Sequence, residues 1–332
     1  MKTTVRQPYT ELQSLLRKGG YFESRNSFYV ARFLFLITLL VAHIACLVFV
    51  DNFPLQICNA IALAFTSTQV GLFAHDIVHR QAWRNEIFDV IVGDLLVGIS
   101  CSWWHNKHNQ KHHAHTNRLG LDTDIEAPFL ALAAEQLEDK KGFEKFLIRF
   151  QAYYFLVVLF FIPVAMHIES ALFLLKNKVK NRGLEAIAFS LHFGIYLTCL
   201  VLSPLNLWQA VIFTLIFKSL FGVYLGLIFI VNHAGMPIFS ADEKIDPFSL
   251  QVLTSRNISA HPITDFLMGG LNAQIEHHLF PQMCRIKLNA SRRLVRKFCL
   301  EKNIPYHETG FIRACVETFS SLNNIGKLSA SQ

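Results

Sequence analysis

The sequence predicts an all-α integral membrane protein with four transmembrane helices in two hairpins, additional interfacial helices and a histidine-rich cytoplasmic cap. The first observation is composition. Of the 332 residues, 52% are hydrophobic and only 17% are charged, which excludes an ordinary soluble or disordered chain. The second is a series of five long apolar stretches. The third is that 30 of the 31 lysines and arginines lie outside these stretches.

The apolar stretches are long enough to consider as membrane spans, because a spanning helix needs about 20 mainly apolar residues. They are residues 33–50, 55–74, 152–173, 184–202 and 205–231. The 32 residues before the first stretch are polar and basic, and no cleavable pattern follows that stretch. We therefore expect no signal peptide, and the first stretch should remain as a membrane anchor.

The basic residues determine which stretches cross, because loops rich in lysine and arginine stay on the cytoplasmic side. The connectors at 51–54 and 203–204 carry no basic residue, so each is expected to be the outer turn of a hairpin. Residues 174–183 carry four, and they would lie outside if 152–173 crossed. We therefore expect 152–173 to lie along the cytoplasmic interface, and the shorter apolar segment 90–102 to be a buried or interfacial helix. The net charge of +7 then reflects membrane orientation and not nucleic-acid binding.

The pattern divides the chain into a cytoplasmic N-terminal segment (1–32), a main membrane domain (33–310) and a C-terminal tail (311–332). The residues after 231 are expected to form a cytoplasmic cap. Within it, a basic helix at 286–302 faces either anionic lipid head groups or solvent. The seven cysteines are scattered without a C-x-x-C motif, so they indicate neither a disulfide scaffold nor a thiolate zinc site.

The fifteen histidines are clustered along the chain and are not spread evenly. Two pairs have the i,i+4 spacing that places both side chains on one face of an α-helix: His75 with His79, and His108 with His112. His113 follows about 100° further round the second helix. Neighbouring histidines in the third cluster, 277–278, either serve two metals or include one that orients the other.

Eight histidines are candidate metal ligands: His75, His79, His108, His112, His113, His233, His277 and His278. They are too many for one tetrahedral zinc site, so two metal ions are expected. Imidazole suits iron, zinc, copper and nickel, and ligand type alone does not choose among them. His105 and His115 flank the second cluster and are expected to be exposed or to support the ligands. The remaining histidines are expected to be structural: His43, His167, His192, His261 and His307.

The order His-x-x-x-His, His-x-x-x-His-His and Gln-x-x-His-His resembles the three histidine boxes of the membrane fatty acid desaturases. Gln274, at the start of the third box, is typical of the front-end acyl desaturases within that family. Trp103-Trp104 and the stretches 232–237 and 251–257 are also similar. The resemblance covers about residues 30–310. One departure is the second box, which has three residues between its first two histidines where many front-end members have two.

The resemblance implies a cytoplasm-facing di-iron centre that uses O2 and two electrons to introduce a cis double bond into a fatty acyl chain. In a front-end enzyme the new bond lies between an existing double bond and the carboxyl end. The resemblance also implies that the eight histidines bind the two iron ions, and that Gln274 and the box histidines are catalytic. Asp76 and Glu276 would either fix imidazole tautomers or be solvated helix acids.

Many eukaryotic front-end enzymes carry a fused haem domain with a His-Pro-Gly-Gly signature, which is not found in this sequence. We therefore expect electrons from a separate ferredoxin or haem protein with its reductase. The other expected partners are a fatty acyl lipid or acyl-CoA and the bilayer of a bacterial inner membrane or endoplasmic reticulum, but no nucleic acid.

Two other classes of function remain open for this chain. A related membrane di-iron hydroxylase, ketolase, acetylenase or sphingolipid desaturase would share the boxes, and product analysis would separate it. A divalent-metal transporter would place ionisable ligands near the middle of its spans. The clear ionisable residues of the predicted spans are few, and they are His43, Glu185, His192 and Lys218.

Overall fold

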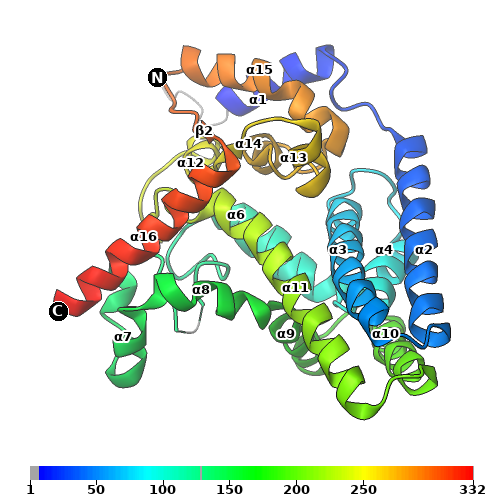
Figure 1. Cartoon of the computed structure of the whole chain (residues 1–332). Helices are drawn as coiled ribbons and strands as arrows, with labels where there is room; N and C mark the ends of the chain where they lie inside the picture. Colours follow the sequence, from blue (N-terminus) through cyan, green and yellow to red (C-terminus); the bar gives the residue numbers. More distant parts are fainter. Residues whose placement is uncertain (1–6, 128, 332) are drawn as a thin grey trace. The chain divides into compact units, whose positions relative to one another are not determined.

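The computed structural model describes residues 7–127 and 129–331 of the chain. Within these ranges the regular structure is helical apart from two strands of two residues each, which confirms the predicted all-α class. The chain forms two compact units (Figure 1). Among the described residues, unit 1 comprises 7–23, 106–127, 129–155 and 228–331, and unit 2 comprises 24–105 and 156–227.

Among the described residues, four helices are long and apolar enough to cross a membrane. They are α2 (Asn26–Phe49), α3 (Phe53–Val78), α10 (Arg182–Leu202) and α11 (Leu207–His233). They coincide with the four stretches predicted to span, so this prediction is confirmed. Asn52 begins α3 by accepting a hydrogen bond from the Leu55 backbone N–H at 3.0 Å, and Pro54 occupies the first turn, where its missing N–H costs nothing.

The fifth apolar stretch, 152–173, does not form one straight helix. It is divided between α8 (Gln151–Phe160) and α9 (Ile162–Lys176), which are bent by 59° at the break. Pro163 lies in the first turn of α9, where a proline favours a new helix start. By length and composition the bent pair is either one broken span or a segment that does not cross, so its interfacial position stays a prediction.

Segment 90–102 is also broken. It contributes to α4 (Glu86–Val90), η1 (Ile91–Val97) and α5 (Cys101–Trp104), and the chain bends by 101° after η1. Gly98 makes this corner with a φ of +78°, and an added Cβ would lie 2.5 Å from the His192 ring. Glycine is therefore required both for the backbone conformation and for the close approach.

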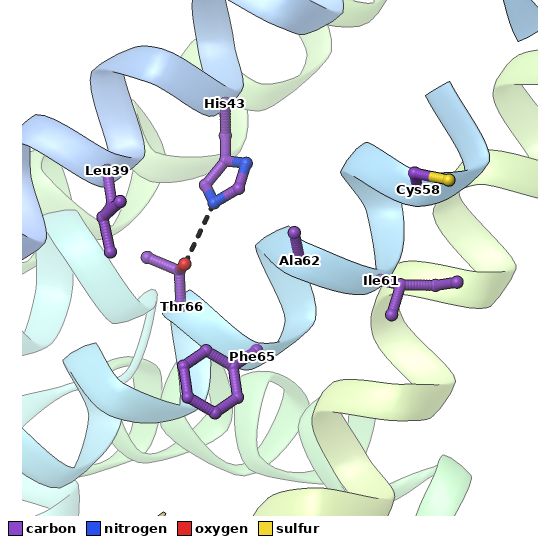
Figure 2. Close-up of a pocket in the computed structure, with 7 residues that line it drawn as sticks. All are labelled: Leu39, His43, Cys58, Ile61, Ala62, Phe65 and Thr66. Carbon is purple, nitrogen blue, oxygen red and sulfur yellow. Dashed lines mark hydrogen bonds between the residues drawn. The ribbon is translucent and has the colours of Figure 1, made fainter. Parts of the chain in front are cut away.

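The isolated histidines of unit 2 have hydrogen-bond partners within the unit. Figure 2 shows His43 of α2, whose ring lies 3.0 Å from the Thr66 hydroxyl on α3. The other ring nitrogen lies 2.8 Å from the Asn59 side-chain oxygen, also on α3. Nδ1 of His167 donates to the Gly98 carbonyl at 2.7 Å, and Nδ1 of His192 donates to the Leu95 carbonyl at 3.0 Å. These contacts fit the structural roles predicted for them.

One hydrophobic core in unit 1 joins four helices. They are α1 (Gln7–Lys18), α12 (Pro247–Leu253), α14 (Gln274–Leu279) and α15 (Arg285–Glu301). α1 runs beside α15 (Figure 1), and its buried leucines 12 and 16 belong to this core. α15 is the predicted basic helix, with Val295 and Phe298 facing inward. Residues 1–6 of the predicted N-terminal segment lie outside the described residues.

The rest of unit 1 consists of short elements and one long helix. The short elements are η2 (His105–His112), α6 (His113–His115), η3 (Glu135–Leu137), α7 (Gly142–Ile148), α13 (Pro262–Leu267), and the parallel strands β1 (Asn257–Ile258) and β2 (Glu308–Thr309). The predicted C-terminal tail is the 21-residue helix α16 (Phe311–Ser331), which packs on α7. Gln332 lies outside the described residues.

Gly222 on α11 allows the tightest helix approach in unit 2, because a Cβ there would lie 2.2 Å from the Leu159 carbonyl oxygen. Gly222→Ala should therefore destabilise the protein by about 1–3 kcal/mol through overpacking against backbone. The measurement is the thermal unfolding midpoint of the purified protein in detergent micelles.

Gly194→Ala on α10 is the matched control, because no atom lies within 4 Å of a Cβ at that position. It should leave the midpoint unchanged or raise it slightly, since alanine favours a helix. Equal midpoints for the two variants would contradict the predicted close packing.

Candidate metal centre

The second histidine cluster lies on η2 and α6, and η2 is a π-helix. In a π-helix, residues i and i+5 are hydrogen-bonded neighbours along the helix, whereas an α-helix pairs i with i+4. This geometry brings together His108 and His113, whose Nε2 atoms lie 3.2 Å apart. The i,i+4 spacing in the sequence predicts an α-helical phase, which does not pair His108 with His113.

The first group of potential ligands in unit 1 consists of His108, His113 and His277. The Nε2 atom of His113 lies 3.2 Å from the Nε2 atoms of both other rings. All three ligand atoms lie within 4.8 Å of one another. Nitrogens bound at 2.0–2.1 Å around one tetrahedral ion would be roughly 3.4 Å apart, so the three rings fit a shared ion.

The second group consists of His112, His233 and His278, and their ligand atoms also lie within 4.8 Å of one another. Their ring centroids are 4.6–5.0 Å apart. His277 and His278 therefore belong to different groups, which favours the expectation that these neighbours serve two metals. The two groups come close where the rings of His113 and His278 stack at 4.3 Å.

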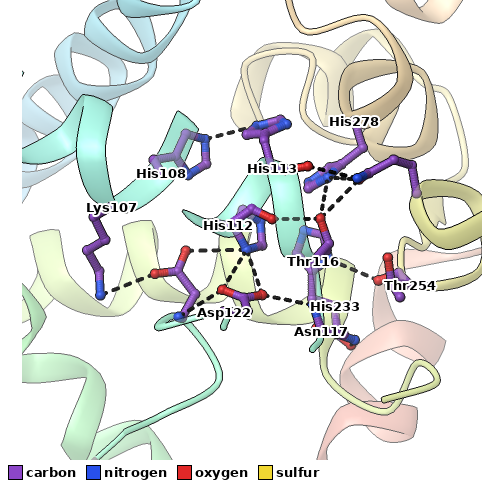
Figure 3. Close-up of polar contacts among 12 residues, drawn as sticks. Lys107, His108, His112, His113, Thr116, Asn117, Asp122, His233, Thr254 and His278 are labelled. Atoms are coloured by element: carbon purple, nitrogen blue, oxygen red, sulfur yellow. Dashed lines mark hydrogen bonds and ion pairs between the residues drawn. The ribbon is translucent and has the colours of Figure 1, made fainter. Parts of the chain in front are cut away.

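In the second group, each ring has one nitrogen held by a protein acceptor, as Figure 3 shows in part. The Nδ1–H of His112 donates to the Asp122 carboxylate at 3.0 Å. The Nδ1–H of His233 donates to the Thr254 carbonyl at 3.0 Å. The Nδ1–H of His278 donates to the Gln251 side-chain oxygen at 2.8 Å. These bonds leave Nε2 of each ring as the acceptor atom, the arrangement typical of metal-ligating histidines. Nε2 of His278 is buried and makes no hydrogen bond within the described chain. A buried unsatisfied nitrogen is rare, and a bound cation would account for it.

Asp122 is the site residue that the sequence analysis missed. It is fully buried and accepts hydrogen bonds from the backbone N–H groups of Asn117 and Asp124, at 2.8 and 3.0 Å, besides that from His112. Burial lowers the pKa of His112, but the negative charges of Asp122 and Asp124 outweigh it and raise that pKa to about 9. A metal ion at Nε2 would replace one proton of this ring and leave the Nδ1–H bond to Asp122 intact.

Gln274, the first residue of the third box, contacts the second group. Its amide nitrogen lies 2.9 Å from Nε2 of His233, and its amide oxygen accepts from the Asn232 side chain at 3.2 Å. In this structure the amide donates to Nε2 of His233, the nitrogen that a metal ion would use, so Gln274 would have to turn away for the ring to bind a metal.

Two of the eight predicted ligands belong to unit 2. His75 lies in the last turn of α3 and His79 caps its end, and their ring centroids are 4.5 Å apart. The i,i+4 prediction for this pair is therefore consistent with the helix. Asp76 is buried, and one of its oxygens lies 3.6 Å from Nδ1 of His75.

Glu276 takes neither role that the sequence left open. It is completely buried, and its carboxylate accepts hydrogen bonds from Asn257 at 2.8 Å and from the Tyr306 hydroxyl at 2.7 Å. Burial raises the pKa of Glu276. Among the described residues, neither His105 nor His115 belongs to a group of potential ligands.

Comparison with protein families and with individual proteins supports the resemblance described from the sequence. A family model described as fatty acid desaturase matches residues 53–310. The chain is 26% identical to the acyl-lipid (9-3)-desaturase of Physcomitrium patens, over 98% of this chain and 63% of that protein. It is 29% identical to the delta(5) fatty acid desaturase of Caenorhabditis elegans, over 97% of this chain and 75% of that protein. It is 30% identical to the delta(8)-fatty-acid desaturase of Euglena gracilis, over 77% of this chain and 64% of that protein. The chain thus spans about two thirds to three quarters of the length of these relatives.

Asp122→Asn tests the hydrogen bond that orients His112. The amide keeps the size of the side chain but loses its charge, so metal affinity should fall by about 10–100-fold, as for other partners of ligating histidines. The measurement is a titration of metal-free protein with Co²⁺ in competition with a chelator. The exposed Asp139→Asn is the control for charge, and equal affinities for the two variants would contradict the assigned role.

Proposed function

The chain belongs to the fatty acid desaturase family, and we propose that it is an O2-dependent desaturase that introduces a cis double bond into a fatty acyl chain. The observation that carries this proposal is the pair of three-histidine groups in unit 1, formed by residues of the matched family region. The reaction converts –CH2–CH2– to –CH=CH– and consumes O2, two electrons and two protons, with two water molecules as the other product.

We further propose that the metal is iron, with two ions per chain. Imidazole suits iron, although it also suits zinc and copper. The chemistry favours iron, because removing hydrogen from an unactivated methylene group is beyond any side-chain acid or base and needs a redox group. When bound, the iron pair would supply the oxidising power drawn from O2. The proposed ligands are His75, His79, His108, His112, His113, His233, His277 and His278. The first two are included for their place in the first histidine box.

The side chains around the ligands have separate proposed roles. Asp122, Gln251 and the Thr254 carbonyl hold ring orientation and tautomer in the second group. Gln274 donates a hydrogen bond to Nε2 of His233, and it would release this nitrogen when His233 binds a metal ion. We propose Gln274 as a catalytic residue because its amide lies within hydrogen-bond distance of a ligand ring.

We propose front-end regiochemistry, in which the new double bond lies between an existing one and the carboxyl end. Two observations support it. Gln274 stands at the first position of the third box, and the C. elegans and Euglena relatives are named delta(5) and delta(8) desaturases. The proposed substrate is therefore an unsaturated acyl chain, carried on a lipid or on coenzyme A.

Expression in a host fed a set of saturated, monounsaturated and polyunsaturated acids tests this activity. Gas chromatography with mass spectrometry should detect new double bonds only on the carboxyl side of existing ones. His278→Ala should abolish the products while the protein still inserts in the membrane, since His278 lies outside the four helices that can span. Products desaturated only in saturated chains, or only towards the methyl end, would refute the front-end assignment, and hydroxylated products would refute desaturation.

Electrons are proposed to come from a separate ferredoxin or haem protein with its reductase. The sequence contains no haem, flavin or nicotinamide fingerprint of its own. On α15, the exposed residues Arg293, Arg296 and Lys297 form a basic surface that would attract an acidic donor by electrostatic steering.

The apolar helices and the family indicate a multi-pass membrane protein. We propose that the histidine clusters, both termini and the loop 174–183 face the cytoplasm of a bacterium, or the cytoplasmic side of the endoplasmic reticulum. The distribution of basic residues supports this orientation.

Lys178→Cys tests the orientation, because Lys178 is exposed between α9 and α10. A membrane-impermeant maleimide should label this cysteine only after the membrane is opened. Pro204→Cys, in the exposed turn between α10 and α11, should be labelled in intact cells or sealed vesicles of native orientation. The unsubstituted protein gives the background from the native cysteines. Labelling of residue 178 from outside would mean that residues 152–173 cross.

A further inference from the structure

The end of α11 is bound by groups from outside the helix. The last four carbonyls of a helix have no partner within it, and they need one when buried. Here each of the carbonyls of residues 231–234 accepts a hydrogen bond from another segment. The guanidinium of Arg256 donates to the carbonyls of Val231 at 2.6 Å and Ala234 at 3.1 Å. The backbone N–H of Arg256 donates to the carbonyl of Asn232 at 2.7 Å. The side chain of Asn117 donates to the carbonyl of His233 at 3.2 Å.

Arg256 therefore binds three of these four carbonyls. It is 1% exposed, and it is the largest of the fully buried side chains in the described chain. The turn that it binds contains His233, a proposed ligand of the second group. The same segment also holds the ring of His233, because the carbonyl of Thr254, two residues before Arg256, accepts the Nδ1–H bond.

A buried guanidinium needs an opposite charge, and Glu317 of α16 supplies it. One carboxylate oxygen of Glu317 lies 3.1 Å from Nε of Arg256. The same carboxylate is 3.0 Å from Nε2 of His307 and 3.2 Å from Nε of Arg313. Because Arg256 is buried and Glu317 is only 27% exposed, this pair is better shielded from solvent than the pairs on the protein surface.

Gly235 lets α16 approach the end of α11. Its φ of +78° is the left-handed conformation usual just after a helix. An added Cβ would lie 3.4 Å from Arg256 Nη2 and 3.4 Å from the Glu317 carbonyl oxygen. The two elements are therefore in direct contact at the turn that carries His233.

We propose that Arg256 is a positioning residue for the second histidine group, and that Glu317 fixes Arg256, so that the C-terminal helix α16 helps to retain metal at His233. The proposal rests on the metal centre proposed above. Neither side chain touches a ligand nitrogen. Arg256 acts by fixing the backbone turn from which His233 projects, and Glu317 acts by placing a negative charge beside the buried guanidinium.

Glu317→Gln tests the proposal more cleanly than a change at Arg256, whose loss would leave three buried carbonyls unpaired and threaten folding. The variant keeps the side-chain size and removes the charge. Glu301→Gln is the matched control, since Glu301 is exposed on α15 and pairs only with Lys297 at 3.7 Å among the described residues.

Two measurements on the purified full-length proteins separate the outcomes. The first is iron per chain after a timed challenge with a chelator, for which Glu317→Gln should lose one of two ions about tenfold faster than the control. The second is amide hydrogen exchange in metal-free protein, for which residues 229–238 should exchange faster in Glu317→Gln while residues 285–301 stay unchanged. The second measurement does not depend on bound metal.

The results distinguish the inference from the function on which it rests. If the unsubstituted protein retains no stoichiometric metal, the proposed metal centre fails. If it retains two ions and Glu317→Gln matches Glu301→Gln in both measurements, the inference fails. Faster exchange throughout unit 1 would mean that Glu317 supports the fold in general, and this result would also overturn the specific link to His233. Glu317→Asp, which restores the charge, should recover slow metal loss in part.

Discussion

The second histidine group depends on one constraint: each imidazole must keep Nε2 unprotonated and pointing inward, so Nδ1 must carry the proton and have an acceptor. The structure meets this with three different acceptors, namely the carboxylate of Asp122, the backbone carbonyl of Thr254 and the amide oxygen of Gln251. Two of the three belong to the segment from α12 towards β1. The helix α12 and the chain that follows it are therefore the main scaffold of this group, although they contribute no ligand of their own.

A second buried polar network holds the helix that carries the third box. Asn257 of β1 accepts a hydrogen bond from the Ile275 backbone N–H at 2.9 Å, near the start of α14, and donates one to Glu276. This pairing links the strand to the helix that carries the third box. A buried polar network of this kind stabilises only when every member is satisfied. Loss of Asn257 would leave both the Glu276 carboxylate and a helix N–H short of a partner, so its cost should exceed that of one hydrogen bond.

Much of this architecture follows from residue type and period alone. Apolar length together with the distribution of basic residues identified the four helices that can span. Histidine clustering, and for His233 its position after the last span, identified six residues that unit 1 gathers into two groups. The sequence could not reveal Asp122 or Arg256, because each reaches its partner through a turn or a distant contact, and neither lies at a helical spacing from a histidine. The π-helix of η2 was also hidden. Its extra residue per hydrogen-bonded turn changes the phase of the second box, and no residue type specifies that insertion.

Two of the helices that can span, α3 and α11, each carry a proposed ligand near their C-terminal end. On α3, His75 lies 22 residues after Phe53, which corresponds to about 33 Å of helix, slightly more than the roughly 30 Å of a hydrocarbon core. On α11, His233 lies 26 residues after Leu207, or about 39 Å. Each helix begins just after a short turn without basic residues, so in the proposed topology each would carry its histidine beyond the opposite face of the membrane. A rigid helix that continues from span to ligand fixes the depth of that ligand relative to the bilayer. In that topology the length of each span would set the depth of its histidine relative to the membrane surface, whereas hydrogen bonds within unit 1 set the orientation of the rings of the second group.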